Sequence, residues 1–292
     1  MTIIADIAHD TPARLGEGVL WSPADEALLW VDVEGRTVHH FDHRTATPRD
    51  AIGYDDRVSN IALRSDGGWA LGLGPGVALT DSSGAVEHRI DLAGEPAGNR
   101  TNDGNVDPSG RLFIGTMPLD LTGARAVGAL HRVDAGGNVE RVVEAVTISN
   151  GIGWSPDETL MYYIDTATRR VDVFDYDRTT GAIEGRRGLI TFDGRSGVPD
   201  GMCVDTDGCL WVALFGGGRV QRFSPSAEPL EQVEVPGAPQ TTCCGFGGPD
   251  LDVLYITTAR IPAMPGADAP HAGSLFSAEV DARGRAANSF AG

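Results

Sequence analysis

The chain has 292 residues, of which 41% are hydrophobic and 22% are charged, and its formal net charge at pH 7 is −18. These proportions are typical of a globular protein with a sizeable core and exclude a disordered chain. The acidic excess makes nucleic acid and anionic membrane surfaces unfavourable partners, because both carry negative charge. All 23 basic residues are arginine, which excludes Schiff-base chemistry on a lysine side chain.

The N-terminal segment and the cysteines predict a cytoplasmic location. Residues 1–10 lack both the basic region and the apolar stretch of a secretion signal. No apolar run approaches the roughly 18 residues of a membrane-spanning helix. The cysteines follow no zinc-binding spacing, and they are Cys203, Cys209, Cys243 and Cys244. We therefore expect free, buried thiols and no membrane association.

One pattern recurs along the chain: a small or polar residue, an apolar strand, a turn, and an aromatic or aliphatic strand. Its copies begin at residues 17, 60, 103, 150, 200 and 244, with spacings of 43, 43, 47, 50 and 44 residues. In chain order the paired segments are 17–23 and 29–32, 60–67 and 69–71, 103–108 and 112–116, 150–157 and 161–165, 200–208 and 210–213, and 244–248 and 254–257.

A third strand follows in several copies, over Val38–Phe41, Leu130–Val133, Val171–Tyr176 and Val220–Phe223. No stretch shows a helical period of 3.6 residues over a helical length. A repeat of about 40–50 residues with four strands is typical of a β-propeller blade. The sequence therefore predicts an all-β fold, a six-bladed β-propeller with four-stranded blades around a central channel, as one domain over residues 1–292. We expect the N-terminal strand, Thr2–Ile7, to complete the last blade.

The first residue of each copy has a predictable place in this fold. The first strand of every blade lines the channel, so these anchor residues converge on the axis. They are Glu17, Asn60, Asp103, Asn150, Asp200 and Cys244. Carboxylates held together repel one another unless a cation neutralises them, and oxygen ligands suit calcium, magnesium or manganese. We predict a divalent metal there; the alternative is a water-filled channel whose carboxylates bind backbone amides.

Several other patterns are interpreted as structural. His39 and His40 are adjacent on a strand and face opposite sides, so they cannot ligate one ion together, and with His43 we expect them at a solvated edge. The glycine-rich segment 72–76 is not followed by a helix and predicts a hairpin turn. The tryptophans that recur at matching repeat positions are assigned to blade packing, and they are Trp21, Trp30, Trp154 and Trp211.

A set of short motifs carries a resemblance to a known family. The motifs are Gly16-Glu17-Gly18-Val19-Leu20-Trp21, Asn102-Asp103-Gly104-Asn105-Val106-Asp107, Gly115-Thr116-Met117, Ser149-Asn150-Gly151, Tyr163-Ile164-Asp165 and Pro199-Asp200-Gly201-Met202-Cys203. In this order and spacing, from about Arg14 to Gly292, the chain resembles the regucalcin/gluconolactonase family of sugar-lactone lactohydrolases. The resemblance implies a six-bladed propeller that hydrolyses sugar lactones.

The resemblance also implies a set of site residues. The metal ligands of the family fall on Glu17, Asn150 and Asp200. The substrate contacts fall on Arg100, Asn102 and Asp120. Asp120 stands where some members have a glutamate, one methylene longer, that touches the sugar.

Two of the polar residues have alternative interpretations. Asp103 lies at the depth of the implied ligands without belonging to the family's set, so it is either a hydrogen-bond acceptor or solvated residue of the channel, or a metal contact through water. Arg100 is assigned to the pocket rather than to a surface ion pair, because it stands just before an axial anchor.

The resulting hypothesis is a metal-dependent lactonase, a carboxylic-ester hydrolase of a sugar-oxidation pathway. A metal ion polarises the lactone carbonyl, Asp200 assists the attack of water, and Arg100 and Asn102 orient the substrate. The expected partner is a small-molecule sugar lactone such as glucono-, xylono-, arabinono- or galactonolactone, and the expected cofactor is one divalent ion: calcium, zinc, manganese, magnesium or ferrous iron. The alternatives are a non-catalytic calcium-binding propeller and a hydrolase of another ester, a phosphotriester or a sulfonated sugar lactone.

Overall fold

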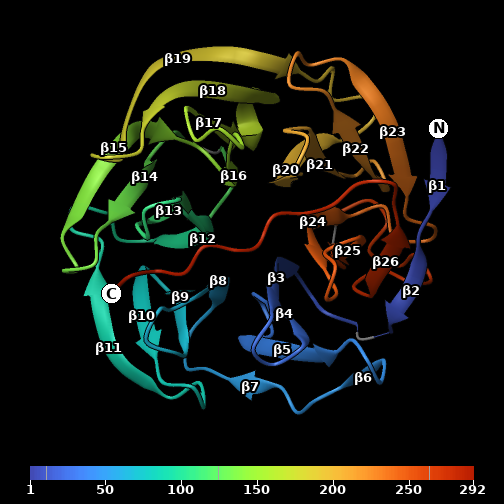
Figure 1. Ribbon diagram of the computed structural model, residues 1–292, viewed down its shortest axis with the longest axis horizontal. Coiled ribbons are helices and arrows are strands. Elements are labelled where there is room, and N and C mark those ends of the chain that lie inside the picture. Colours follow the sequence, from blue (N-terminus) through green and yellow to red (C-terminus); the bar gives the residue numbers. More distant parts are fainter. Residues whose placement is uncertain (11, 124, 263) are drawn as a thin grey trace.

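The computed structural model describes residues 1–10, 12–123, 125–262 and 264–292, and it confirms the six-bladed β-propeller. Six sheets stand in a ring around a central channel (Figure 1). The described residues contain no α-helix; a single 3₁₀ turn, η1, spans Thr166–Thr168. None of the described helical segments has the length and apolar character needed to cross a membrane.

The blades follow one another along the chain, and within each the strands run from the channel outward. The first three blades contain β3 (Gly16–Ser22), β4 (Ala27–Asp32), β5 (Thr37–Asp42), β6 (Thr47–Pro48) and β7 (Ile52–Gly53); β8 (Val58–Leu63), β9 (Trp69–Leu73), β10 (Gly76–Thr80) and β11 (Val86–Asp91); and β12 (Asn99–Val106), β13 (Leu112–Pro118), β14 (Gly128–Val133) and β15 (Val139–Val146). The last three contain β16 (Ser149–Trp154), β17 (Leu160–Asp165), β18 (Arg170–Asp177) and β19 (Ala182–Thr191); β20 (Val198–Val204), β21 (Leu210–Phe215), β22 (Arg219–Phe223) and β23 (Pro229–Glu234); and β24 (Thr241–Gly247), β25 (Val253–Thr258) and β26 (Leu275–Glu279).

The N-terminal prediction was wrong in one respect. Residues 2–7 do not form a single strand of the last blade. Instead β2 (Asp6–His9) pairs antiparallel with β26 and completes that blade, whereas β1 (Thr2–Ile4) pairs parallel with β23 in the neighbouring blade. Ala5 is buried between the two segments and donates its N–H to Glu234 O at 2.9 Å. A segment that crosses from one blade to the next covers two sheet edges, so it closes the ring more completely than a single strand.

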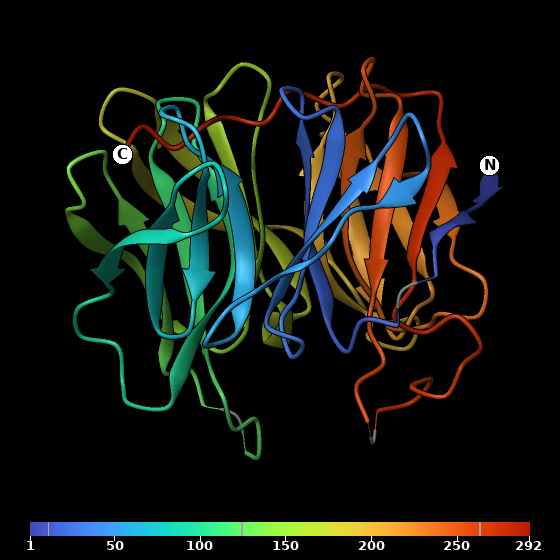
Figure 2. The ribbon, with the colours of Figure 1, turned by 90° about the horizontal axis from the view of Figure 1, so that it is seen from below.

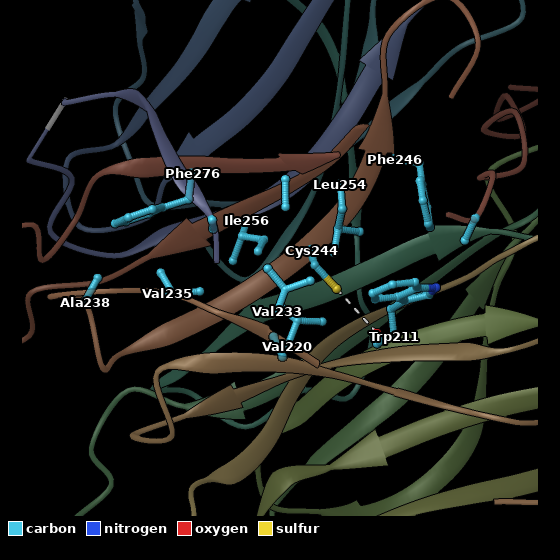
Figure 3. Packing of buried hydrophobic residues seen from close by; sticks show 14 residues of the cluster. Trp211, Val220, Val233, Val235, Ala238, Cys244, Phe246, Leu254, Ile256 and Phe276 are labelled. Carbon is cyan, nitrogen blue, oxygen red and sulfur yellow. Dashed lines mark hydrogen bonds between the residues drawn. The ribbon is translucent and has the colours of Figure 1, made fainter. Parts of the chain in front are cut away.

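Apolar side chains between neighbouring blades form the core. Figure 3 shows the cluster in which Trp211 and Val220 of the fifth blade meet Ile256 and Phe276 of the sixth. Cys244 lies in the same cluster, with Sγ 3.3 Å from Trp211 O. The prediction of free thiols is confirmed for all cysteines, although Cys203 is only half-buried. The four repeated tryptophans are buried, as blade packing requires.

The histidines of β5 are not at a solvated edge, and that prediction was wrong. His39 stacks on Trp30 with ring centroids 4.8 Å apart, and His40 packs against Trp69 at 5.3 Å. The two rings lie on opposite faces of the strand, as expected. Burial lowers the pKa of both rings, because the neutral imidazole is favoured away from water.

The pairing register shifts in every innermost strand near its anchor residue. The shifts fall between Glu17 and Leu20, Val58 and Asn60, Thr101 and Gly104, Asn150 and Ile152, Pro199 and Met202, and Thr241 and Cys243. A bulge of this kind bends the strand and re-aims its side chains. A β-bulge or a similar irregularity thus recurs in each innermost strand, close to its anchor residue.

The last residues of the chain were not assigned from sequence, and they form a strap across the channel. This C-terminal strap, residues 284–292, runs over one face of the ring (Figures 1 and 2). It bridges to Asp205 and Arg64 through Gly284 and Phe290, and Arg285 Nη1 donates to Trp154 O at 3.1 Å. The strap therefore connects blades on opposite sides of the channel.

Replacing Phe290 with alanine is expected to destabilise the fold. Phe290 is 0% exposed and packs with the core between the second and third blades, so the free energy of unfolding should fall by about 3–5 kcal/mol. Urea titration measures this change. Leu230→Ala, at a side chain that is 42% exposed, is the control and should change stability by less than about 0.5 kcal/mol. Equal effects of the two substitutions would contradict a structural role for the strap.

Candidate active site

The three predicted metal ligands converge at one end of the channel. Glu17, Asn150 and Asp200 lie near the beginning of β3, β16 and β20, and they are 7%, 3% and 7% exposed. Innermost strands run in the same direction in each blade, so their first residues meet at one face. The loops 118–127 and 262–271 project from this face, opposite the C-terminal strap (Figure 2). Residues 124 and 263 of these loops lie outside the described residues.

A chain of hydrogen bonds connects three blades through this site. Arg100 Nη1 donates to Asn102 Oδ1 at 2.6 Å, and Asn102 Nδ2 donates to Asn150 Oδ1 at 3.0 Å. Asn150 Nδ2 in turn donates to Thr166 Oγ1 at 2.8 Å, and that hydroxyl donates to Pro199 O, also at 2.8 Å. These hydrogen bonds fix the orientation of the side-chain amides of Asn102 and Asn150. Asn150 Oδ1 keeps a second lone pair available for a ligand.

Burial and neighbouring negative charge disfavour the ionised form of both carboxyl groups in the predicted ligand set. Burial raises the pKa of Glu17 well above its ordinary value, and the negative charges of Asp200 and Asp103 add to this effect. The pKa of Asp200 is raised by burial first and by Asp103 second. The positive charge of Arg100 acts in the opposite direction on both. The site thus carries negative charge that the protein itself compensates only in part.

Arg100 is a buried guanidinium rather than a member of a surface ion pair. It is 7% exposed, and burial lowers its pKa to about 10, a value at which it stays protonated at neutral pH. In the described part of the chain its hydrogen bonds use only Nη1, toward Thr101 O and Asn102 Oδ1. Nε and Nη2 are therefore available to a carbonyl, hydroxyl or carboxylate oxygen of a bound molecule.

Asp103 lies deeper in the channel than the hydrogen-bonded chain. Its Oδ1 accepts from Gly104 N at 2.7 Å, and burial raises its pKa to about 6. It lines a cavity of about 160 Å³ together with Asn60, Cys243 and residues 285–288 of the strap. Glu17, Asn150 and Asp200 are not in the lining of that cavity. Asp103 is thus a hydrogen-bond acceptor for the backbone, as one interpretation expected. Its contact with a metal through water stays a prediction.

Asp120 is not brought together with the other predicted substrate contacts. It is exposed on the loop after β13, where its Oδ1 accepts from Thr122 N at 2.8 Å. Among the described residues no hydrogen bond joins it to Arg100 or Asn102. Its contact with a sugar stays a prediction.

The donor set is chemically suited to a hard divalent ion. Two carboxylates and an amide oxygen are the ligand types that such ions prefer, and a cation would relieve the repulsion that raises the pKa of Glu17 and Asp200. Within the described ranges no three His, Cys, Asp or Glu side chains are grouped closely enough to hold a metal by themselves. The predicted set combines two carboxylates with the amide of Asn150.

Thr166 is a site residue that the sequence did not predict. It begins the 3₁₀ turn after the second strand of the fourth blade and connects Asn150 to the backbone just before Asp200. The repeat pattern selects polar residues only at the start of the first strand of each copy. A hydroxyl directly after the second strand, in the blade that supplies the amide ligand, is the signal that could have found it.

Fold and site together define a six-bladed propeller with buried carboxyl groups, amides and a guanidinium gathered at one end of its channel. Residues 15–260 match the family described as "SMP-30/Gluconolactonase/LRE-like region", and the chain belongs to this family.

Named relatives cover most of the chain. Regucalcin of Sus scrofa is 38% identical over 270 residues, 89% of each chain. "Putative sugar lactone lactonase YvrE" of Bacillus subtilis (strain 168) is 36% identical over 295 residues, 99% of each. The crystal structure of a calcium-binding protein, regucalcin from Agrobacterium tumefaciens str. C58, superposes with a TM-score of 0.92 at 30% identity, over 99% of this chain and 98% of the other. The resemblance inferred from the motifs is thereby confirmed.

Replacing Asp103 with asparagine is expected to stabilise the metal-free protein at pH 8. The folded state raises the pKa of Asp103 from 3.8 to about 6, so folding favours the protonated form and the ionised form costs stability above that pH. The melting temperature of Asp103→Asn should exceed that of the unmodified protein by a few degrees at pH 8, and the difference should shrink as the pH falls to 5.

Thermal unfolding with a chelator present, at pH 5, 6.5 and 8, measures this difference. Asp66→Asn, at an exposed turn residue, is the matched control and should show no such pH dependence. A variant that is less stable than the unmodified protein at pH 8 would show that the Asp103 carboxylate stabilises the fold.

Proposed function

We propose that this protein is a metal-dependent lactonase that hydrolyses a sugar lactone to the aldonic acid. The observation that carries the proposal is the convergence of Glu17, Asn150 and Asp200 beside Arg100 and Asn102 at one end of the channel. Membership of the SMP-30/gluconolactonase/LRE-like family supports this function. The name of the Bacillus subtilis relative, which matches over nearly the whole chain, supports it as well.

Glu17, Asn150 and Asp200 would hold one divalent ion: calcium, zinc, manganese, magnesium or ferrous iron. When bound, such an ion polarises a carbonyl oxygen and lowers the pKa of a water molecule. The Agrobacterium tumefaciens regucalcin is described as a calcium-binding protein, which supports a divalent ion in this fold.

The remaining steps depend on the side chains of the chain itself. The Asp200 carboxylate, whose proton affinity is raised by burial, is suited to accept a proton from the attacking water. Nε and Nη2 of Arg100 bind substrate oxygen and stabilise the negative charge that develops as the ring opens. Asn102, held between Arg100 and Asn150, keeps the guanidinium and the ligand amide in register.

Aldonolactones such as glucono-, xylono-, arabinono- and galactonolactone fit this set of donors and acceptors. Each presents a ring carbonyl for the hydrolytic centre and several hydroxyl groups for Arg100 and Asn102. In a cell such a lactone would be the product of a sugar oxidation.

The protein is expected to hydrolyse at least one aldonolactone above the spontaneous rate, and a chelator should abolish this activity. A pH-indicator assay over a panel of aldonolactones measures acid release, with calcium, magnesium, manganese, zinc or ferrous iron added back after chelation. The uncatalysed rate is subtracted for each lactone. Metal binding without any turnover would instead favour a non-catalytic calcium-binding propeller.

Replacing Asp200 with asparagine should reduce kcat by about 10²–10⁴-fold, because the variant cannot accept a proton from water. The same panel assay, at a saturating metal concentration, measures the loss. Full activity of Asp200→Asn would assign the proton transfer to another group.

Replacing Arg100 with methionine should separate substrate binding from metal binding. The substitution removes the guanidinium and keeps a long side chain, so kcat/KM should fall by about 100-fold or more. The affinity for Mn²⁺, measured by electron paramagnetic resonance of the free ion, should stay within a few-fold of the original. Arg89→Met, at an exposed ion pair with Asp55, is the control. Equal loss of metal affinity and turnover in Arg100→Met would contradict a role in substrate binding.

A further inference from the structure

The segment that leads into Glu17 is held by a buried carboxylate. Asp32, the last residue of β4, accepts from Arg14 N through Oδ2 at 3.0 Å and from Leu15 N through Oδ1 at 3.1 Å. The carbonyl of Leu15 accepts from Val33 N at 2.9 Å. The backbone N–H and C=O of Leu15, two positions before Glu17, are thus both held by hydrogen bonds.

The segment that leads into Asn150 is held in the same way. Asp165, the last residue of β17, accepts from Thr147 N through Oδ2 and from Ile148 N through Oδ1, both at 3.0 Å. The carbonyl of Ile148 accepts from Thr166 N at 3.0 Å. The arrangement matches that of the first blade atom for atom, and the residues bound are again those three and two positions before the proposed ligand.

The second strand ends in an aspartate in the first and fourth blades, which are the blades that supply Glu17 and Asn150. The second strands of the other four blades end in Leu73, Pro118, Phe215 and Thr258. Asp200, the remaining proposed ligand, follows Pro199, whose ring restricts the backbone without a hydrogen bond. An acidic residue at the end of β4 and β17 therefore coincides with the placement of Glu17 and Asn150.

Each carboxylate makes the backbone segment that precedes a proposed ligand more rigid. Asp32 and Asp165 are 7% and 4% exposed, and each accepts one further backbone N–H, from Gly35 at 3.0 Å and from Ala167 at 3.3 Å. Charged hydrogen bonds in a buried place are stronger than neutral ones. A metal or substrate site requires its side chains to be held within about 0.5 Å of the working geometry.

We propose that Asp32 and Asp165 are positioning residues, which hold the backbone before Glu17 and Asn150 so that the two side chains are preorganised for a divalent ion. The inference deepens the proposed function and rests on it for the identity of the ligands. It assigns to two carboxylates a role in the site although neither is proposed to touch the metal or the substrate.

The test compares Asp32→Asn and Asp165→Asn with a matched control. An asparagine side chain has one acceptor atom and one donor group, so it cannot accept from two backbone N–H groups through two oxygens. Asp107→Asn is the control: Asp107 is also buried and accepts from Ser109 N at 2.9 Å and Arg111 N at 2.8 Å, both through Oδ1, while its Oδ2 accepts from the Tyr176 hydroxyl at 2.7 Å and from Arg111 Nη1 at 2.8 Å. It follows the end of β12, at the opposite end of the innermost strands from the site.

We expect the affinity for Mn²⁺, measured by electron paramagnetic resonance, to fall about 10- to 100-fold in Asp32→Asn and Asp165→Asn, as for other supporting residues of metal sites. Lactone kcat/KM should fall in parallel and recover in part at high Mn²⁺. Asp107→Asn should lower the melting temperature and leave the Mn²⁺ affinity within about twofold. Loss of stability without loss of affinity in the two site variants would overturn the proposal.

Amide hydrogen exchange on the unmodified protein decides the case even where a variant does not fold. The backbone N–H groups of residues 14, 15, 147 and 148 should already exchange slowly in the metal-free protein, and bound Mn²⁺ should change their exchange little, because the two carboxylates hold these segments before the ion binds. Fast exchange of these groups in the metal-free protein, slowed only when Mn²⁺ binds, would overturn the proposal. If the unmodified protein binds Mn²⁺ but hydrolyses no lactone, the proposed function fails, and the affinity and exchange measurements still test the positioning role.

Discussion

The rest of this structure depends on the convergence of six innermost strands on one axis. Closure of the ring places Glu17, Asp103 and Asp200 along the channel, where burial raises the pKa of all three and the charge of Asp103 adds to the shift of Glu17 and of Asp200. A propeller could fill its channel with apolar side chains at no such cost. The retained negative charge, the amides of Asn102 and Asn150 and the buried guanidinium of Arg100 distinguish this end of the channel from a packed apolar core.

The two ends of the channel have different structures. The C-terminal strap covers one end and connects blades that are far apart in sequence. The other end carries the beginnings of β3, β16 and β20 and is bordered by the loops 118–127 and 262–271 (Figure 2). The proposed metal ligands thus come from strands, whereas the border of this end of the channel comes from loops.

The hydrogen bonds of the site join neighbouring blades and hold the backbone beside two of the proposed ligands. Arg100, Asn102, Asn150 and Thr166 connect the third, fourth and fifth blades, and the carboxylates of Asp32 and Asp165 fix the backbone before two of the proposed ligands. No single blade supplies all of these polar groups. The site exists only because the blades are held in a closed ring, so its geometry is as rigid as the apolar packing between them.

The sequence by itself determined the repeat, and with it the fold and the ring of axial anchors. Strand alternation and turn chemistry are local properties, and a repeat of regular length has one common solution in a propeller. The motif order also identified the family, and the anchors Glu17, Asn150 and Asp200 do lie close to the axis. Only the tertiary structure decided how the N-terminus is divided between two blades, that residues 284–292 cross the channel, that the half-buried His39 and His40 pack against tryptophans, and that Thr166, Asp32 and Asp165 support the site. Asp120, assigned from the resemblance, lies in an exposed loop whose place the repeat does not determine. The physical reason is common to these cases: each depends on contacts between residues far apart in the chain, which a local pattern does not contain.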